Sequence, residues 1–139
     1  YVKKHGNELE RLISENSQKT VHYIHGKVDE EIRDEIKEIA ETSSNNIIIA
    51  SYGTFSTGIN IRNLHHIVFA SFSKSVIRVL QSIGRGARLA EGKDYFEVHD
   101  LCDNLIKKSK QNFSMQHGLA RIEIYNNQKF DYEIKKINL

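Results

Sequence analysis

The stretch from Ile47 to Ile61, Ile-Ile-Ile-Ala-Ser-Tyr-Gly-Thr-Phe-Ser-Thr-Gly-Ile-Asn-Ile, decides the fold class of this 139-residue chain. It opens with a continuous apolar run, which is typical of a strand covered on both faces. Two glycines and four Ser/Thr residues follow directly. Glycine lets a ligand approach the backbone, and free N–H groups and small hydroxyls can hold phosphate oxygens. A turn with a capped short helix is an equally good interpretation of this composition.

The segments on either side of this stretch alternate between strand and helix patterns. Asp29 is a predicted helix N-cap, and Glu30 and Glu31 follow in the first turn, where the helix dipole favours acids. The patterns predict strands at 21–24, 47–50, 67–70, 95–98 and 130–137. They predict helices at 29–40, about 74–88 and 104–126, the last broken or kinked near Gly118. Strands separated by helices imply βαβ units with right-handed crossovers, and therefore an α/β fold with a mainly parallel sheet.

Composition limits the class of protein without assigning a function. The chain is 39% hydrophobic and 27% charged, with a formal net charge of +2, so overall charge does not indicate a nucleic-acid partner. The single cysteine, Cys102, excludes an internal disulfide and fits a cytoplasmic protein. No apolar run approaches the ~20 residues of a membrane span, and no signal peptide opens the chain. Because the first residue is Tyr1, we expect the chain to be part of a longer protein.

The predicted helix at 74–88 carries the sequence Gln81-Ser-Ile-Gly-Arg-Gly-Ala-Arg88. Its residues divide into two faces: Val76, Val79, Leu80, Ile83 and Ala87 on one, and Arg78, Gln81, Arg85 and Arg88 on the other. A solvated arginine face is the simplest interpretation. However, a glycine costs about 1 kcal/mol relative to alanine inside a helix. Gly84 and Gly86 therefore predict a close approach to the backbone or the end of the helix.

These segments together resemble the motifs of superfamily 2 helicases. Gln81-x-x-Gly84-Arg85-x-x-Arg88 is similar to motif VI, Thr57-Gly58-Ile59-Asn60 to motif V, and His25-Gly26 to a His-Gly step in the family's second motor domain. The order and spacing also match. The resemblance covers nearly the whole chain and includes phage recombination and repair helicases, whose final helix and strand are similar to residues 117–139. It implies a RecA-like three-layer domain over residues 1–139, with its first strand truncated and a helix–strand extension at about 104–139.

The resemblance also implies roles for the matching residues. The family's ATP site lies between two RecA-like domains, and the second domain supplies arginine fingers. Guanidinium groups can stabilise the charge that develops in phosphoryl transfer. Arg85 and Arg88 would be these fingers, with Arg88 at the γ-phosphate. The other matching residues would be Gln81, Gly58 and Asn60 near the nucleotide, and Gly26, Ser51, Gly53 and Thr54 at the backbone of single-stranded or branched DNA. Many relatives carry an acid where Asn60 stands.

The other half of an ATP site is missing from this sequence. A P-loop requires Gly-x-x-x-x-Gly-Lys-Ser/Thr. The nearest stretch, from Gly86 to Asp94, has five residues between its glycines, and Asp94 stands where Ser or Thr is needed. Asp34-Glu35 lies in a predicted helix and is no magnesium-binding box. We therefore expect ATP to bind with Mg²⁺ held mainly by an N-terminal RecA-like domain of the same protein.

Several other residues have simpler structural interpretations. His99-Asp100-x-Cys102-Asp103 offers metal-ligand types, but the crowding after a strand gives poor tetrahedral geometry, so no metal site is predicted. His65-His66 is interpreted as a surface turn, and Tyr125, Phe130 and Tyr132 as core. The lysines Lys107, Lys108 and Lys110 are either a solvated helix face or part of a DNA track.

Two functional alternatives stay open at this stage. One is a superfamily 2 RNA helicase or chromatin-type translocase, because both kinds of nucleic acid bind through their backbone. The other is a non-catalytic α/β module that binds nucleic acid. The preference for DNA rests on the resemblance to phage helicases.

Overall fold

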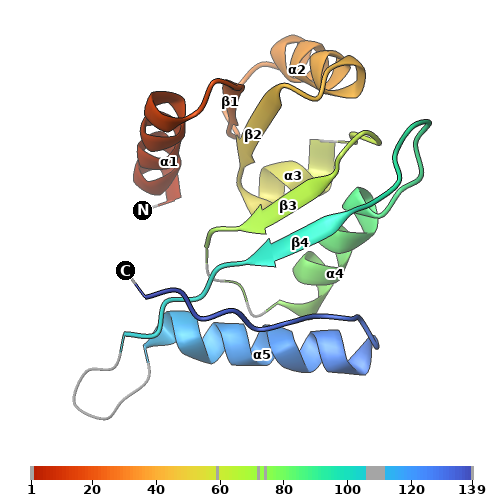
Figure 1. The fold of residues 1–139 in the computed structure, drawn as a ribbon. Helices are drawn as coiled ribbons and strands as arrows, with labels where there is room; N and C mark the ends of the chain where they lie inside the picture. Colours follow the sequence, from red (N-terminus) through yellow and green to blue (C-terminus); the bar gives the residue numbers. More distant parts are fainter. Residues whose placement is uncertain (1, 59, 72, 74, 106–111, 139) are drawn as a thin grey trace. The chain divides into compact units, whose positions relative to one another are not determined.

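The structure is a computed structural model that describes residues 2–58, 60–71, 73, 75–105 and 112–138. Helices and strands alternate along the chain (Figure 1): α1 Val2–Asn16, β1 Thr20–Ile24, α2 Glu30–Thr42, β2 Asn46–Ala50, α3 Tyr52–Gly58, β3 His66–Phe69, α4 Val76–Gly86, β4 Glu97–Asp100 and α5 Phe113–Asn127. The chain forms two compact units. The first comprises Tyr1–Ile67 and Leu80–Val98, and the second Val68–Val79 and His99–Leu139.

The first unit is built on a βαβ motif. Strands β1 and β2 are parallel, in a register that runs from Thr20 opposite Asn46 to Ile24 opposite Ala50, and α2 connects them. Asp29 stands at the N-cap of α2 with two acids behind it, as predicted, although its side chain makes no capping hydrogen bond. The fold class, the strands at 21–24 and 47–50 and the helix between them are therefore confirmed.

The core of the first unit lies between these elements and the segment after α3. Ile24, Ala40 and Ile61 are buried there. The partly buried residues packed against them are Val28, Ile36, Ile48, Ala50, Phe55 and Leu64. Strand β2 is half-buried along its whole length, as its continuous apolar run indicated. The core therefore packs the end of β2 against α3 and the segment that follows α3.

Helix α1 was not among the elements predicted from the sequence. Residues 2–16 are helical, and Arg11 pairs with Glu8 at 2.7 Å and with Glu15 at 2.8 Å on its exposed side. Glu and Arg three or four residues apart lie on one helix face, so this pattern could have predicted the helix. At Gly6 an added Cβ would lie 2.3 Å from the Tyr23 ring, so glycine allows α1 to approach β1 closely.

Strands β3 and β4 form a second two-stranded sheet. Glu97 N–H donates to His65 C=O at 2.8 Å and Leu101 N–H to Phe69 C=O at 3.2 Å, so both strands run in the same direction. The bounds of β4 and α4 were predicted wrongly. Strand β4 begins at Glu97 instead of Tyr95, because Glu97 makes the first of these ladder bonds, and α4 spans 76–86 instead of 74–88.

The second unit contains an ion pair around Arg121 of α5. The Arg121 side chain is fully buried and donates to the Asp100 carboxylate from Nε at 2.7 Å and from Nη2 at 2.6 Å. Its Nη1 donates to Ser73 C=O at 3.1 Å, and the Tyr125 hydroxyl donates to Asp100 at 2.8 Å. Buried charges are stable only when paired and hydrogen-bonded in this way. Asp100 is therefore a structural acceptor at the end of β4.

The predicted kink at Gly118 is wrong. Helix α5 is continuous from Phe113 to Asn127. Residues 106–111 of the predicted helix lie outside the described residues. Gly118 is buried, and an added Cβ would lie 2.5 Å from the Cys102 sulfur. The glycine therefore permits close packing of Cys102 on the helix, a requirement that periodicity along one segment does not reveal.

The predicted last strand at 130–137 is also wrong. The chain turns at Lys129, whose φ of 56° lies in the left-handed region, and Phe130 N–H donates to Tyr125 C=O at 3.0 Å. The segment then runs back beside α5 without entering a sheet (Figure 1). Tyr125 is buried as predicted, whereas Phe130 and Tyr132 are 38% and 45% exposed, although both rings contact Tyr125.

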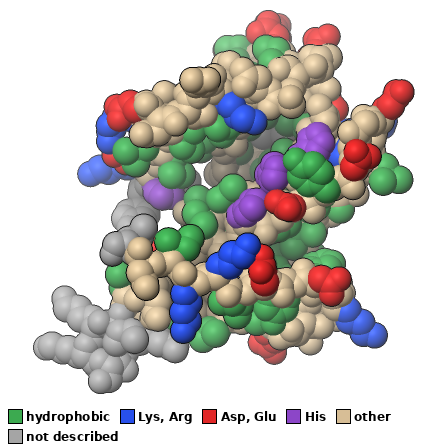
Figure 2. Space-filling model, in the orientation of Figure 1, with side chains coloured by type: hydrophobic (Ala, Val, Ile, Leu, Met, Phe, Trp, Pro, Cys, Tyr) green, Lys and Arg blue, Asp and Glu red, His purple; other side chains and the backbone are tan. Residues whose placement is uncertain are grey.

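The surface carries many apolar side chains as well as charged ones (Figure 2). Large hydrophobic residues such as Leu89, Leu101 and Phe113 are more than half exposed. Among the described residues, no helix combines the length and the apolar character that crossing a membrane requires.

Candidate ATP and nucleic-acid site

Helix α4 ends at Gly86, so Arg88 lies in the segment beyond the helix and not on its last turn as predicted. Gly86 is buried, and an added Cβ would lie 2.0 Å from the Phe96 ring. Both predicted reasons for a glycine, a helix end and a close approach, therefore apply at Gly86. An added Cβ at Gly84 would meet nothing within 4 Å, so neither reason applies there.

The two predicted faces of α4 are only partly confirmed. Val79 is fully buried, and Leu80 and Ile83 are half-buried. Val76 is 50% exposed, and Ser82 occupies a buried position that the sequence did not indicate. On the other face Arg78 and Gln81 are exposed, whereas Arg85 is half-buried. The basic face is therefore present, with Arg85 less accessible than Arg88.

A pair of substitutions tests the packing at the end of α4. Gly86→Ala is expected to destabilise the chain by about 1–3 kcal/mol, because its methyl group would overlap the Phe96 ring. Gly84→Ala is the matched control and should raise stability by up to about 1 kcal/mol, because alanine is favoured within a helix. Urea unfolding followed by circular dichroism measures both. Equal effects of the two substitutions would contradict the close approach.

Arg88 and Asn60 contact each other directly. Arg88 Nη1 donates a hydrogen bond to Asn60 Oδ1, and both residues are exposed. Asn60 follows Gly58, the last residue of α3, across one residue that the structure does not describe. The two sequence motifs therefore meet in space. The partner of Arg88 is a neutral amide and not a carboxylate, so the positive charge of the guanidinium is not neutralised by this contact.

Two further charged residues fix the backbone around this pair. Lys93 Nζ donates to the carbonyl oxygens of Arg62 at 3.2 Å, of Arg88 at 2.9 Å and of Gly86. The Glu41 carboxylate accepts the N–H groups of Arg62 and, at 3.2 Å, of Asn63. Burial lowers the pKa of Lys93, and the nearby Glu41 charge partly offsets this effect. The side chains of Lys93 and Glu41 are thus both hydrogen-bonded to backbone groups.

A second group of residues surrounds a pocket of about 230 Å³ at the ends of β1 and β2. Its lining includes Gly26 and Ser51, two of the predicted nucleic-acid contacts, together with Lys3, Tyr23, His25 and Lys27. Gly26 has open space around it, and its neighbour Lys27 is exposed. Lysines, a small hydroxyl and accessible backbone are the groups that contact phosphate and sugar in nucleic-acid complexes.

Ser51 and Thr54 also have a structural role at the start of α3. The Ser51 Oγ accepts the Thr54 N–H at 3.2 Å and lies 2.9 Å from the Thr54 hydroxyl. This is the usual arrangement of a helix N-cap, so the capped short helix considered for this loop is present. Thr54 is buried, whereas Gly53 is exposed. Of the four predicted nucleic-acid contacts, Thr54 is therefore the least accessible.

Three residues of these two groups were not predicted as site residues from the sequence: Lys3, Lys27 and Lys93. Lys27 directly follows the His25-Gly26 step, and the exposed positive charge beside it was a usable signal. Lys93 was considered only as part of a rejected P-loop. Its contacts with three carbonyl groups depend on where the chain folds back, which no local pattern specifies.

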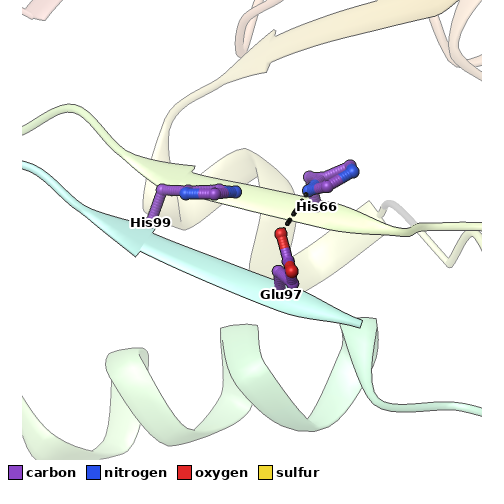
Figure 3. A group of neighbouring side chains, drawn as sticks. All are labelled: His66, Glu97 and His99. Atoms are coloured by element: carbon purple, nitrogen blue, oxygen red, sulfur yellow. Dashed lines mark ion pairs between the residues drawn. The ribbon is translucent and has the colours of Figure 1, made fainter. Parts of the chain in front are cut away.

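His66 and Glu97 form an exposed ion pair between β3 and β4 (Figure 3). The His66 Nδ1 lies 3.4 Å from the Glu97 carboxylate, and the Tyr95 hydroxyl lies 3.3 Å from the His66 Nε2. His66 thus opens a strand and does not form the predicted surface turn.

The lysines considered as part of a DNA track, Lys107, Lys108 and Lys110, lie outside the described residues.

Comparison with known proteins agrees with these motifs. The model of the helicase conserved C-terminal domain family matches residues 2–90. The ATP-dependent DNA helicase uvsW of Enterobacteria phage T4 is 42% identical over 97% of this chain, which spans 29% of that protein. A solved structure of the C-terminal part of the Fun30 ATPase domain superposes with a TM-score of 0.58 and covers 86% of this chain and 44% of that one. With 16% identity, this last likeness supports the fold alone.

Proposed function

This chain belongs to the family of helicase conserved C-terminal domains, and on that premise we propose that it is the second motor domain of an ATP-dependent DNA helicase or translocase acting in recombination or repair. The 42% identity to a phage DNA helicase supports DNA as the substrate. We further propose that residues 1–139 act as one domain, with about 104–139 as its extension, and that its partner is an N-terminal RecA-like domain of the same protein.

The contact between Arg88 and Asn60 carries the ATP half of this proposal. It joins the two sequence motifs that the family uses around its nucleotide, and it presents an exposed guanidinium whose charge is available to a phosphate. Arg88 would contact the γ-phosphate and Arg85 would support it, while Gln81, Gly58 and Asn60 would lie near the nucleotide. An arginine fork is well matched to phosphate oxygens.

The same residues fit a nucleotide phosphate better than a magnesium ion. Mg²⁺ prefers carboxylate oxygens, and the Glu41 carboxylate, which lies beside the Arg62 backbone, accepts backbone N–H groups. We therefore assign Mg²⁺ mainly to carboxylates of the first domain. When bound, the ion would neutralise charge that develops on the phosphates. The contribution of this chain would be the guanidinium of Arg88.

The pocket at Gly26 and Ser51 supports the nucleic-acid half of the proposal. Lys3 and Lys27 bring positive charge to a surface with accessible backbone at Gly26 and Gly53. Such a surface binds phosphates and sugars, so little sequence preference is expected. Thr54 would contribute indirectly, since its hydroxyl lies within hydrogen-bond distance of the Ser51 side chain.

The incomplete ATP site predicts that this 139-residue chain alone hydrolyses ATP negligibly, because the sequence holds no P-loop and no acidic box. Phosphate release should be measured with Mg²⁺, ATP and single-stranded DNA, for the chain and for the full-length protein side by side. Only the full-length protein is expected to turn over. Robust magnesium-dependent hydrolysis by the purified chain would contradict a shared site.

A further inference from the structure

The ammonium group of Lys93 lies where three backbone carbonyl groups converge. It donates to Arg62 C=O at 3.2 Å, to Arg88 C=O at 2.9 Å and to Gly86 C=O. A lysine ammonium has three N–H donors and no acceptor, so these contacts can use all of its hydrogen bonds. The group is therefore well placed to hold these three backbone positions together.

The three carbonyl groups belong to the two segments that carry Arg88 and Asn60. Gly86 and Arg88 flank the point where the chain leaves α4, and the last carbonyl groups of a helix lack partners within the helix. Arg62 lies two residues after Asn60. One side chain thus connects the backbone on both sides of the Arg88–Asn60 hydrogen bond.

The surrounding contacts fix Lys93 itself. A turn closed by Lys93 N–H to Ala90 C=O at 3.2 Å includes Gly92, whose φ of 73° favours glycine. The ammonium lies 5.3 Å from the centre of the Phe96 ring, the same ring that packs against Gly86. On the other side of the loop, Glu41 accepts the N–H of Arg62. The Arg62 backbone is therefore held through both its N–H and its C=O.

We propose that Lys93 is a positioning residue that holds Arg88 and Asn60 in the arrangement needed for ATP hydrolysis. This inference rests on the proposed function of Arg88. Lys93 itself would not contact the nucleotide, because its donors are directed at backbone oxygens. A displacement of about 1 Å at a catalytic group can cost about 10²-fold in rate. Loss of the ammonium should therefore lower turnover more than nucleotide binding.

The test uses the full-length protein with DNA-stimulated ATP hydrolysis as the readout. Lys93→Met removes the ammonium and keeps the length of the side chain, and Lys93→Arg keeps a cation with several donors. Lys37→Met is the matched control, because the Lys37 side chain on α2 is 39% exposed and its pair with Asp34 is 3.8 Å long. Arg88→Ala and the double variant Arg88→Ala/Lys93→Met complete a double-mutant cycle. If Lys93→Met does not fold, Lys93→Gln, which is too short to reach the three oxygens, replaces it.

The expected result is a loss of at least about tenfold in kcat for Lys93→Met, with KM for ATP changed less than about threefold. Lys93→Arg should recover most of this loss, and Lys37→Met should match the unmodified protein. The double variant should be no slower than Arg88→Ala, since Lys93 acts through Arg88. If Lys93 stabilised the fold without acting through Arg88, the kcat losses of the two single variants would instead multiply in the double variant.

Two results would overturn the positioning role while leaving the proposed function intact. One is normal turnover in Lys93→Met together with a large loss in Arg88→Ala. The other is a double variant in which both losses multiply in full. Normal turnover in Arg88→Ala would instead show that the proposed function of Arg88 is wrong, and the positioning role would fall with it.

Discussion

Arg88→Ala in the full-length protein is expected to lower kcat for DNA-stimulated ATP hydrolysis by about 10³-fold, the lower end of what arginine fingers contribute. The guanidinium is exposed, is hydrogen-bonded to the neutral Asn60 amide, and would stabilise charge that develops only as the phosphate leaves. ATP binding should therefore change little. Phosphate release measures the first effect, and equilibrium binding of a labelled ATP analogue the second. Arg85→Ala should also lower turnover while sparing binding.

The control for this experiment is Arg11→Ala. Arg11 lies on the exposed side of α1, and within the part of the chain that the structure describes its side chain pairs with Glu8 and Glu15 of the same helix. The substitution Arg11→Ala removes the same type of side chain without changing the candidate site, so turnover should stay normal. Near-normal turnover in both Arg85→Ala and Arg88→Ala would refute their assignment as fingers. A loss of nucleotide binding equal to the loss of turnover would indicate a role in ground-state binding.

Arg121→Met is expected to destabilise the chain by about 3–5 kcal/mol, the usual cost of removing one partner of a buried ion pair. The Arg121 side chain is fully buried, and that of Asp100 is 18% exposed. Without the guanidinium, the Asp100 carboxylate keeps its hydrogen bond from the Tyr125 hydroxyl, and the Ser73 carbonyl loses the hydrogen bond from Arg121 Nη1. Urea unfolding of the 139-residue chain, followed by circular dichroism, measures the change.

The exposed pairs of Arg11 again provide the comparison. Arg11→Ala breaks two salt bridges of similar length, yet exposed pairs contribute only about 0–1 kcal/mol. The two arginine substitutions should therefore differ by several-fold in their effect on the free energy of unfolding. Similar small effects would mean that Asp100 becomes solvated once Arg121 is gone, and that its pairing contributes little.

The sequence by itself determined the elements whose signal is local. Val21–Ile24, Ile47–Ala50 and the helix after Asp29 were predicted because hydrophobic periodicity and capping acids act within a few residues. The family was also predictable, because the three motifs around Gly26, Gly58 and Arg88 occur in the right order. The match to residues 2–90 confirms that assignment.

Only the tertiary structure decided the features that depend on distant partners. Helix α4 ends at Gly86 where the Phe96 ring packs, and α5 continues through Gly118, where Cys102 lies against the helix. The alternating segment at 130–137 forms no strand, because it runs back beside α5 and not along a strand with a free edge. Alternation predicts which faces a strand would have, but a strand forms only where a neighbour accepts its hydrogen bonds.

In the candidate site too, some features were predictable from the sequence and others depend on the tertiary structure. Sequence motifs identified Arg88 and Asn60, because the chemistry of phosphate transfer limits which residue types can serve it. Their hydrogen bond, and the contacts of Lys93 with Arg62, Gly86 and Arg88, arise where the chain folds back on itself at Gly92. Contacts across about thirty residues depend on the packing of the whole unit, and no spacing within the sequence encodes them.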